Sequence, residues 1–162
     1  MNAPQRRAAV LIASTRAAAG VYTDRSAPVI TGWLAAHGFQ TGEAVIVADG
    51  EPVREALRRL LLDSPSVIIT SGGTGLSPDD RTPEMTEGLL ERTIPGLMEA
   101  IRAAGRDKTP HAALGRGHAG TAGRTFIINL PGSPGGVADA LGVLDPVISH
   151  LCEQIEGGHG HE

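Results

Sequence analysis

The sequence is poor in aromatic and sulfur-containing residues, and it has no dense run of positive charge. Aromatic side chains make up 2% of the 162 residues, and Cys152 is the single cysteine. One cysteine excludes an internal disulfide and a cysteine metal cluster, and the apolar helical pattern around it predicts a core residue. The formal charge of −4, without a block of Lys or Arg, argues against nucleic acid as a partner.

The sequence also lacks a long hydrophobic run near its N-terminus. The apolar segment "AAVLIAS", at residues 8–14, is too short for a signal sequence or a membrane span. We therefore expect a cytoplasmic protein with no membrane partner.

Glycine and proline are plentiful, with 22 and 11 residues, and they concentrate where turns are expected. Function is therefore expected in the loops, while Ala, Val, Ile and Leu build the core. The length fits one domain. We expect this domain over residues 1–156, followed by a flexible tail at 157–162. The tail residues His159 and His161 are better explained as part of a disordered terminus than as metal ligands.

Short apolar runs alternate along the chain with amphipathic helical patterns. This alternation predicts an α/β fold, a three-layer sandwich whose central, mostly parallel sheet has helices on both faces. The spacing predicts strands at 8–14, 39–49 and 66–70, and helices at 25–38, 51–64 and 82–93. Ser26 and Thr82 are the expected N-caps, and Gly38 is the expected stop of its helix. A helix at 96–105, candidate strands at 111–117 and 121–129, and one long helix from Val137 to Ile155 follow.

The stretch "TSGGTGLSPDDRTPE", residues 70–84, follows a predicted strand, where open parallel sheets bind ligands. It is not a Walker A motif, because no Gly-Lys-Ser/Thr follows. It is not a dinucleotide fingerprint either, because Pro78 replaces the third glycine. Glycine amides, with the hydroxyls of Ser71, Thr74 and Ser77, fit an anion, and phosphate suits them best.

Acidic residues accompany this glycine loop. Asp79 and Asp80 would repel a phosphate unless a hard cation lay between them, and Mg²⁺ commonly takes one or two carboxylates plus phosphate oxygens. Asp49, in "VADGEP", lies at the end of another predicted strand. With ordinary Asp pKa values near ~3.9, these groups are charged at pH 7 and suit Mg²⁺ better than proton donation. The alternatives are a tight turn for the loop and an N-cap role for Asp49.

A third loop, "NLPGSPGG" at residues 129–136, joins an apolar strand to the last predicted helix. Its prolines fix φ and its glycines permit close approach of the backbone, so a ligand could rest on this loop and on the helix N-terminus. The alternative is a rigid turn.

Taken together, the loops resemble the molybdenum-cofactor biosynthesis fold family, in particular its stand-alone MogA/MoaB-type molybdopterin adenylyltransferases and the related domain of gephyrin. The resemblance covers nearly the whole chain, and its segments occur in the family's order: "STRAAAGVYTDRSAP", "VADGE", "TSGGTGLSPDDRTPE", "TIPGLMEAIR" and "NLPGSPGGV". It implies an α/β homotrimer that adenylylates molybdopterin with ATP and Mg²⁺ and contacts other proteins of molybdenum cofactor biosynthesis.

The resemblance also assigns residues. The family's essential acids fall on Asp49 and Asp80, which it makes catalytic and Mg²⁺-binding; Asp79 is then an accessory. Family resemblance places pterin or phosphate contacts on Ser14, Asp24 and Arg116. It places nucleotide binding on the residues of two loops: Ser71, Gly72, Gly73, Thr74, Gly75, Pro131, Gly132 and Ser133.

The sequence departs from its relatives at two places. Gly115-Arg116 stands where many relatives carry Ser-Arg, so a hydroxyl contact with the substrate is missing, and Arg116 is either an anion partner or a solvated surface residue. Ser14-Thr15-Arg16 stands where relatives often have Ser-Asp. Three functions stay open: an adenylyltransferase, a related nucleotide hydrolase or deamidase, and a pterin-binding homologue without catalysis.

Overall fold

The computed structural model describes residues 5–158, and within them seven strands form one sheet. Six follow the order β2-β1-β4-β7-β6-β5, and the seventh, β3, pairs with β1 beside β2. The strands are β1 (Arg7–Ala13), β2 (Gln40–Thr41), β3 (Val45–Val47), β4 (Val67–Ser71), β5 (Arg92–Thr93), β6 (Ala119–Ala122) and β7 (Thr125–Leu130). β1 pairs in parallel with β2, β3 and β4, and β4 pairs in parallel with β7. Only β6 runs against its neighbours β5 and β7. The sheet is therefore mostly parallel, which confirms the predicted fold class.

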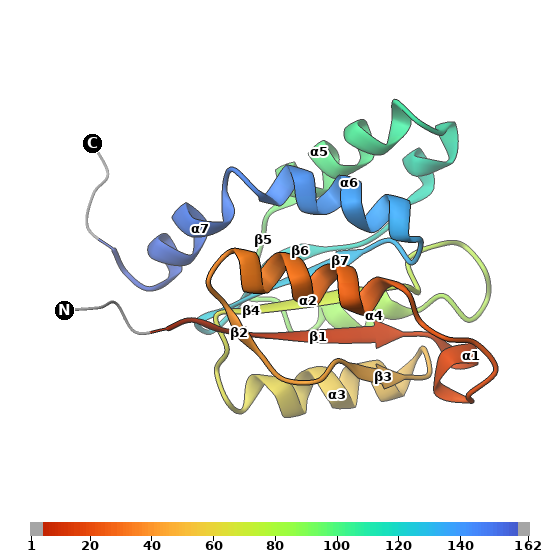
Figure 1. The fold of residues 1–162 in the computed structure, drawn as a ribbon, viewed down its shortest axis with the longest axis horizontal. Coiled ribbons are helices and arrows are strands. Elements are labelled where there is room, and N and C mark those ends of the chain that lie inside the picture. The colour runs from red at the N-terminus through yellow and green to blue at the C-terminus, as the bar shows by residue number, and fades with distance from the viewer. Residues whose placement is uncertain (1–4, 159–162) are drawn as a thin grey trace.

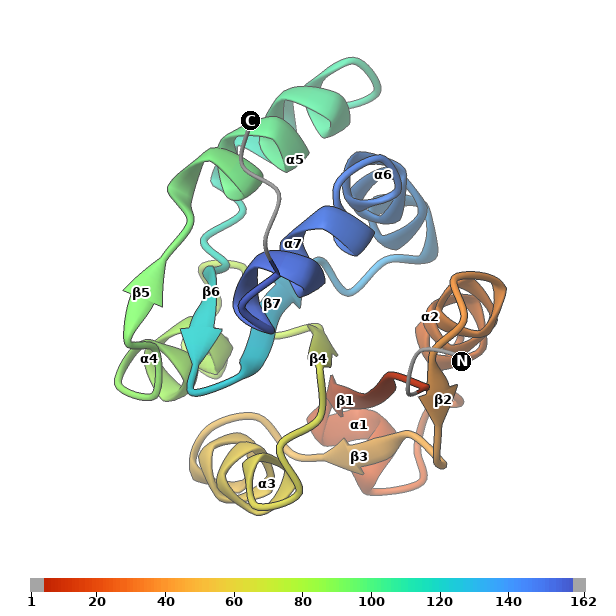
Figure 2. The ribbon, with the colours of Figure 1, turned by 90° about the vertical axis from the view of Figure 1, so that its left-hand side faces the viewer.

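Helices cover both faces of this sheet (Figures 1 and 2). α2 (Ser26–Ala36), α5 (Pro95–Arg106), α6 (Pro134–Leu144) and α7 (Ile148–Ile155) pack on one face, and α3 (Glu51–Leu61) and α4 (Thr82–Glu87) pack on the other. The short helices α1 (Thr15–Ala18) and η1 (Pro110–Leu114), the latter a 3₁₀ helix, complete the described chain. None of these helices has both the length and the apolar character that crossing a membrane requires.

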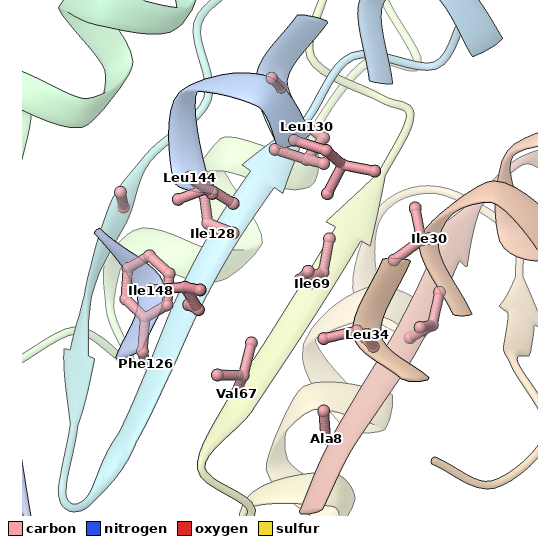
Figure 3. Packing of buried hydrophobic residues seen from close by; sticks show 14 of the residues in the cluster. Ala8, Ile30, Leu34, Val67, Ile69, Phe126, Ile128, Leu130, Leu144 and Ile148 are labelled. Carbon is pink, nitrogen blue, oxygen red and sulfur yellow. The ribbon is translucent and has the colours of Figure 1, made fainter. Parts of the chain in front are cut away.

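Successive side chains of the central strands point to opposite faces of the sheet, and they build two separate hydrophobic cores. In β4, Val67 and Ile69 pack beneath α2 and α6 (Figure 3), whereas Ile68 points to the opposite core with Leu57 of α3. A parallel strand buried on both faces is mostly apolar, because each side chain meets a helix layer. Cys152 lies in the first core, as predicted, and burial raises the pKa of its thiol to about 11.

Five predicted elements differ from the structure. The candidate strand 121–129 is the end of β6, a turn at Gly123 and Arg124, and most of β7. The predicted strand 39–49 is two short strands, because Gly42 and Glu43 are poor strand formers. The predicted helix 82–93 ends at Glu87, and β5 joins the sheet instead. The candidate strand 111–117 is replaced by η1, which Pro110 begins and the Thr109 hydroxyl caps. The long last helix breaks between α6 and α7 at Pro146, which has no N–H to donate.

The predicted helix caps are partly wrong. Arg25 and Arg81 are the N-caps of α2 and α4, one residue before the predicted Ser26 and Thr82. The carboxylate of Asp24 accepts from the N–H of Ala27 at 2.7 Å and so takes over the capping of α2. Gly38 has φ of +81°, which confirms the predicted stop after that helix. His159 and His161 lie outside the described residues.

Candidate active site

The carboxyl ends of β1, β4 and β7 lie together at one end of the sheet, on the right in Figure 1, and hydrogen bonds join their loops. The hydroxyl of Ser71 donates to the carbonyl of Pro131 at 2.7 Å, and the N–H of Gly72 donates to Leu130 at 3.1 Å. The hydroxyl of Ser26, at the start of α2, donates to the carbonyl of Gly132 at 3.0 Å. The loops that the sequence singled out therefore form one surface.

Buried polar contacts fix this surface from below. Asn129 of β7 is fully buried, and its amide donates to the hydroxyls of Thr70 at 2.9 Å and Thr86 at 3.1 Å. Its side-chain oxygen accepts from the N–H of His118 at 2.9 Å. One side chain thus ties β4, α4 and the segment before β6 together beneath the glycine loop. Sequence reasoning gave Asn129 no role, because its partners are far away along the chain.

Two glycines of the glycine loop lie against the two acids. Gly73 has φ of +68°, and a Cβ there would lie 2.0 Å from Oδ2 of Asp49. At Gly75, a Cβ would lie 2.7 Å from Oδ2 of Asp80. The backbone of this loop is therefore packed directly against both acids. In the part of the chain that the structure describes, the amides of Gly73, Thr74 and Gly75 donate to no protein acceptor, so they can receive an anion.

Asp49 is held by three donors and is not the N-cap of α3, whose N-cap is Gly50. Its Oδ1 accepts from the N–H of Gly50 at 2.7 Å, the hydroxyl of Thr82 at 3.1 Å and the N–H of Arg81 at 3.3 Å. Burial is the largest influence on this carboxyl, and it raises the pKa of Asp49; nearby Asp80 acts in the same direction, and the hydrogen bonds oppose both. A bound cation would offset the repulsion between the charges of Asp49 and Asp80 in this half-buried position.

Asp80 lies on the other side of the same loop. Its Oδ2 accepts from the N–H of Ser77 at 3.0 Å. Within residues 5–158 no group of three His, Cys, Asp or Glu side chains could hold a metal by itself. Two carboxylates of hard oxygen character, next to unpaired amides, fit Mg²⁺ that takes its other ligands from phosphate and water. Asp79, the accessory acid, is exposed.

A cavity of about 530 Å³ opens beside the loops. Several of the predicted nucleotide-binding residues line it: Thr74, Gly75, Pro131, Gly132 and Ser133. The opposite wall comes from α5, η1 and the start of α6, with Met98, Ile101, Arg102, Lys108, His111 and Asp139. Its size is that of a small-molecule site. Sequence reasoning missed the second wall, because η1 was predicted to be a strand.

The predicted substrate-side residues lie apart from this cavity. The hydroxyl of Ser14 accepts from the N–H of Ala17 at 3.1 Å and caps α1, and the carboxylate of Asp24 caps α2. Arg116 is the partner of the glycine loop: its guanidinium donates to Gly75 and Asp80 carbonyls and pairs with Glu84. The contacts that the resemblance assigns to these three residues remain predictions.

The raised pKa of Asp49 makes a stability prediction. Between the ordinary Asp pKa of ~3.9 and the higher value in the fold, the unfolded chain has released this proton and the folded protein has not, so stability falls as the pH rises. Asp49→Asn keeps an oxygen acceptor and cannot ionise. We expect this variant to gain free energy of unfolding over the native protein as the pH rises from 3.5 to 7, measured by urea unfolding without Mg²⁺. Asp79→Asn is the control, and an advantage for Asp49→Asn that shrinks with rising pH would contradict the assignment.

The chain belongs to a known family. The chain is a member of the family described as probable molybdopterin binding domains, whose model matches residues 9–150. A molybdopterin adenylyltransferase of Helicobacter pylori is 34% identical over 154 residues, which cover 93% of this chain and 88% of that protein. A molybdenum cofactor biosynthesis bifunctional protein of Synechococcus elongatus is 37% identical over 156 residues, or 94% of this chain. The chain spans only 49% of that relative's length.

Solved structures agree with the family match. The molybdopterin biosynthesis Mog protein from Mycobacterium ulcerans superposes with a TM-score of 0.91 at 52% identity, covering 96% of this chain and 99% of that one. A structure of MogA gives a TM-score of 0.91 at 57% identity, covering 93% of this chain and 99% of that one. The MogA/MoaB-type resemblance predicted from the loops is confirmed.

Proposed function

We propose that the chain is a molybdopterin adenylyltransferase of molybdenum cofactor biosynthesis, which uses ATP and Mg²⁺. A role in molybdenum cofactor biosynthesis is supported by the family match and by the relatives. The observation that carries the finer assignment is the glycine loop between two acids: Asp49 against Gly73, and Asp80 against Gly75. This arrangement joins unpaired amides for phosphate oxygens to two carboxylates for a cation.

The proposed reaction joins two phosphates. An oxygen of the terminal phosphate of molybdopterin forms a bond to the α-phosphorus of ATP, and the bond from that phosphorus to pyrophosphate breaks. The amides of Gly73, Thr74 and Gly75 hold phosphate oxygens in line for this attack, which saves the entropy of aligning two substrates. Asp49 and Asp80 would hold Mg²⁺, which would offset the negative charge of the phosphates. No side chain needs to form a covalent intermediate.

One assay separates the three functions that the sequence leaves open. The purified protein is incubated with molybdopterin, ATP and Mg²⁺, and both pyrophosphate and adenylylated molybdopterin are measured. Equal amounts of the two products support the transferase. Nucleotide hydrolysis without the adenylylated product indicates a hydrolase, and binding of molybdopterin without release of pyrophosphate indicates a binding homologue. Either result would overturn the proposal.

The proposal also includes a homotrimer and a location in the cytoplasm. The mass of the protein in solution measures the number of subunits directly.

Gly115 offers a test of the cavity as part of this site. A Cβ at Gly115 would meet only the carbonyl of Ala112 at 3.5 Å, an ordinary contact, whereas one at Gly117 would lie 2.7 Å from the carbonyl of Asn129. Both glycines line the cavity. We expect Gly115→Ser to stay within about 0.5 kcal/mol of native stability and to lower the KM for molybdopterin up to ~tenfold through a new hydrogen bond.

The matched control is Gly117→Ser, which we expect to lose on the order of 1–3 kcal/mol because the core must shift. Thermal unfolding and steady-state kinetics measure the two effects. If Gly115→Ser left the KM for molybdopterin unchanged, the cavity would not be part of the molybdopterin site.

A further inference from the structure

Arg116 lies between two residues that line the cavity, Gly115 and Gly117, but it does not line the cavity itself. Its side chain turns to the glycine loop instead. Nε donates to the carbonyl of Gly75 at 2.8 Å, and one terminal nitrogen donates to the carbonyl of Asp80 at 2.9 Å. The other terminal nitrogen pairs with the carboxylate of Glu84 at 2.8 Å. All three guanidinium nitrogens are therefore engaged by protein acceptors.

The two carbonyls belong to the two ends of one turn, residues 75–80. Inside this turn the N–H of Asp80 donates to the carbonyl of Ser77 at 2.9 Å, and the N–H of Ser77 donates back to the Asp80 carboxylate at 3.0 Å. The backbone N–H of Arg116 adds a bond to the carbonyl of Thr74 at 3.1 Å. A single residue thus holds the turn closed at both ends, with the Asp80 carboxylate folded over Gly75.

Glu84, in the first turn of α4, fixes the guanidinium from the far side. The pair is partly exposed, with 31% of the Arg116 side chain and 40% of the Glu84 side chain accessible. Arginine suits this position because its planar fork can meet three acceptors at once, whereas the single ammonium of lysine cannot span them. Glu84 therefore aligns the guanidinium from α4, outside the turn at residues 75–80.

We propose that Arg116 is a positioning residue, held by Glu84, that sets Asp80 and the amides of the glycine loop for the metal-bound nucleotide. It does not bind the substrate's anionic group. This inference rests on the proposed function, because the nucleotide and the cation are those of the adenylyl transfer. It assigns Arg116 a task different from the substrate contact that the resemblance implies.

Glu84→Gln distinguishes a positioning role of Arg116 from binding of the substrate's anion, because the two roles predict changes in different kinetic quantities. If Arg116 positions the loop, loss of the Glu84 charge loosens the clamp, and we expect the Mg²⁺ concentration for half-maximal activity to rise several-fold with the KM for molybdopterin unchanged. If Arg116 binds the substrate's anion, the same change frees its guanidinium, and the KM for molybdopterin falls. A fall in that KM would overturn the proposal.

Arg116→Lys tests the fork itself. We expect a rise of about tenfold in the half-saturating Mg²⁺ concentration, because the lysine loses at least one charge-assisted hydrogen bond. Arg116→Gln should show a larger effect in the same direction. The control is Arg124→Lys. The native Arg124 side chain donates to the carbonyl of Glu156, which is not part of the glycine loop. Equal Mg²⁺ dependence for Arg116→Lys and the native protein would contradict the clamp.

Hydrogen exchange on the ligand-free protein separates this inference from the proposed function. The hydrogen-bonded backbone amides of Ser77, Asp80 and Thr82 should exchange about tenfold faster in Arg116→Lys than in the native protein, with the rest of the chain unchanged. This readout does not depend on adenylyl transfer. If the native protein transfers no adenylyl group but these amides exchange faster in Arg116→Lys, the proposed function fails and the positioning role of Arg116 stands. Unchanged exchange of these amides would overturn the clamp, whatever the activity.

Discussion

Replacing Asp80 by asparagine is expected to lower the turnover of adenylyl transfer by about a hundredfold or more, as loss of an electrostatic stabiliser can. The fold should remain intact, because the asparagine oxygen can still accept from the N–H of Ser77. The lost charge removes one of the two carboxylates beside the glycine loop, and in the proposed reaction the Mg²⁺ ion that offsets the phosphate charge would be held less tightly. The measurement is kcat for adenylylated molybdopterin at saturating ATP and Mg²⁺.

The neighbouring acid provides the control for this experiment. Asp79→Asn makes the same chemical change one residue earlier, on an exposed side chain. We expect it to keep turnover close to the native value. Native-like turnover by Asp80→Asn, or an equal loss in both variants, would remove Asp80 from the catalytic site.

Gly72→Ala is expected to produce the largest loss of stability. Gly72 has φ of +94°, and a Cβ there would lie 2.4 Å from the carbonyl oxygen of Ala13 in β1. The contact is with a backbone atom at the carboxyl end of β1, so no flexible side chain can move away. The left-handed conformation costs about 1–2 kcal/mol, and overpacking adds roughly 1–3 kcal/mol. Urea unfolding measures the sum.

Gly50→Ala separates these two contributions. Gly50 has nearly the same φ, +93°, but a Cβ there would meet no atom within 4 Å. It should therefore lose only the conformational part of the free energy. Similar losses in the free energy of unfolding at both positions would mean that the backbone of β1 can shift to make room for a Cβ. The close approach of the loop to β1 would then not be what requires glycine at residue 72.

The position of the site could be predicted because it depends on local patterns and on one rule of topology. The apolar run before Ser71 marks a buried strand, and parallel strands end at the same edge of a sheet. Asp49 and Asp80 therefore had to come close once the strands alternated with helices. In the structure a Cβ at Gly73 would lie 2.0 Å from Oδ2 of Asp49, so the loop after β3 contacts the glycine loop after β4.

The errors arise where long-range contacts or single residues override a local pattern. Leu144 and Ile148 are both buried, so the apolar spacing runs on through the break that Pro146 makes between α6 and α7. The two residues of β5 have no strand pattern of their own, and they are extended because they pair with β6. The contacts that Arg116 makes could not be predicted, because two of its acceptors are backbone carbonyls, which leave no trace in the sequence.

The burial of Cys152, a residue of α7, has a practical consequence for spectroscopy. It is the single cysteine of the sequence, and with a thiol pKa near 11 almost none of it is the reactive thiolate at neutral pH. A cysteine introduced on the glycine loop would then be the one position that a maleimide dye or a spin label modifies in the folded protein. Motions of that loop could be followed by such a label without first removing the native thiol.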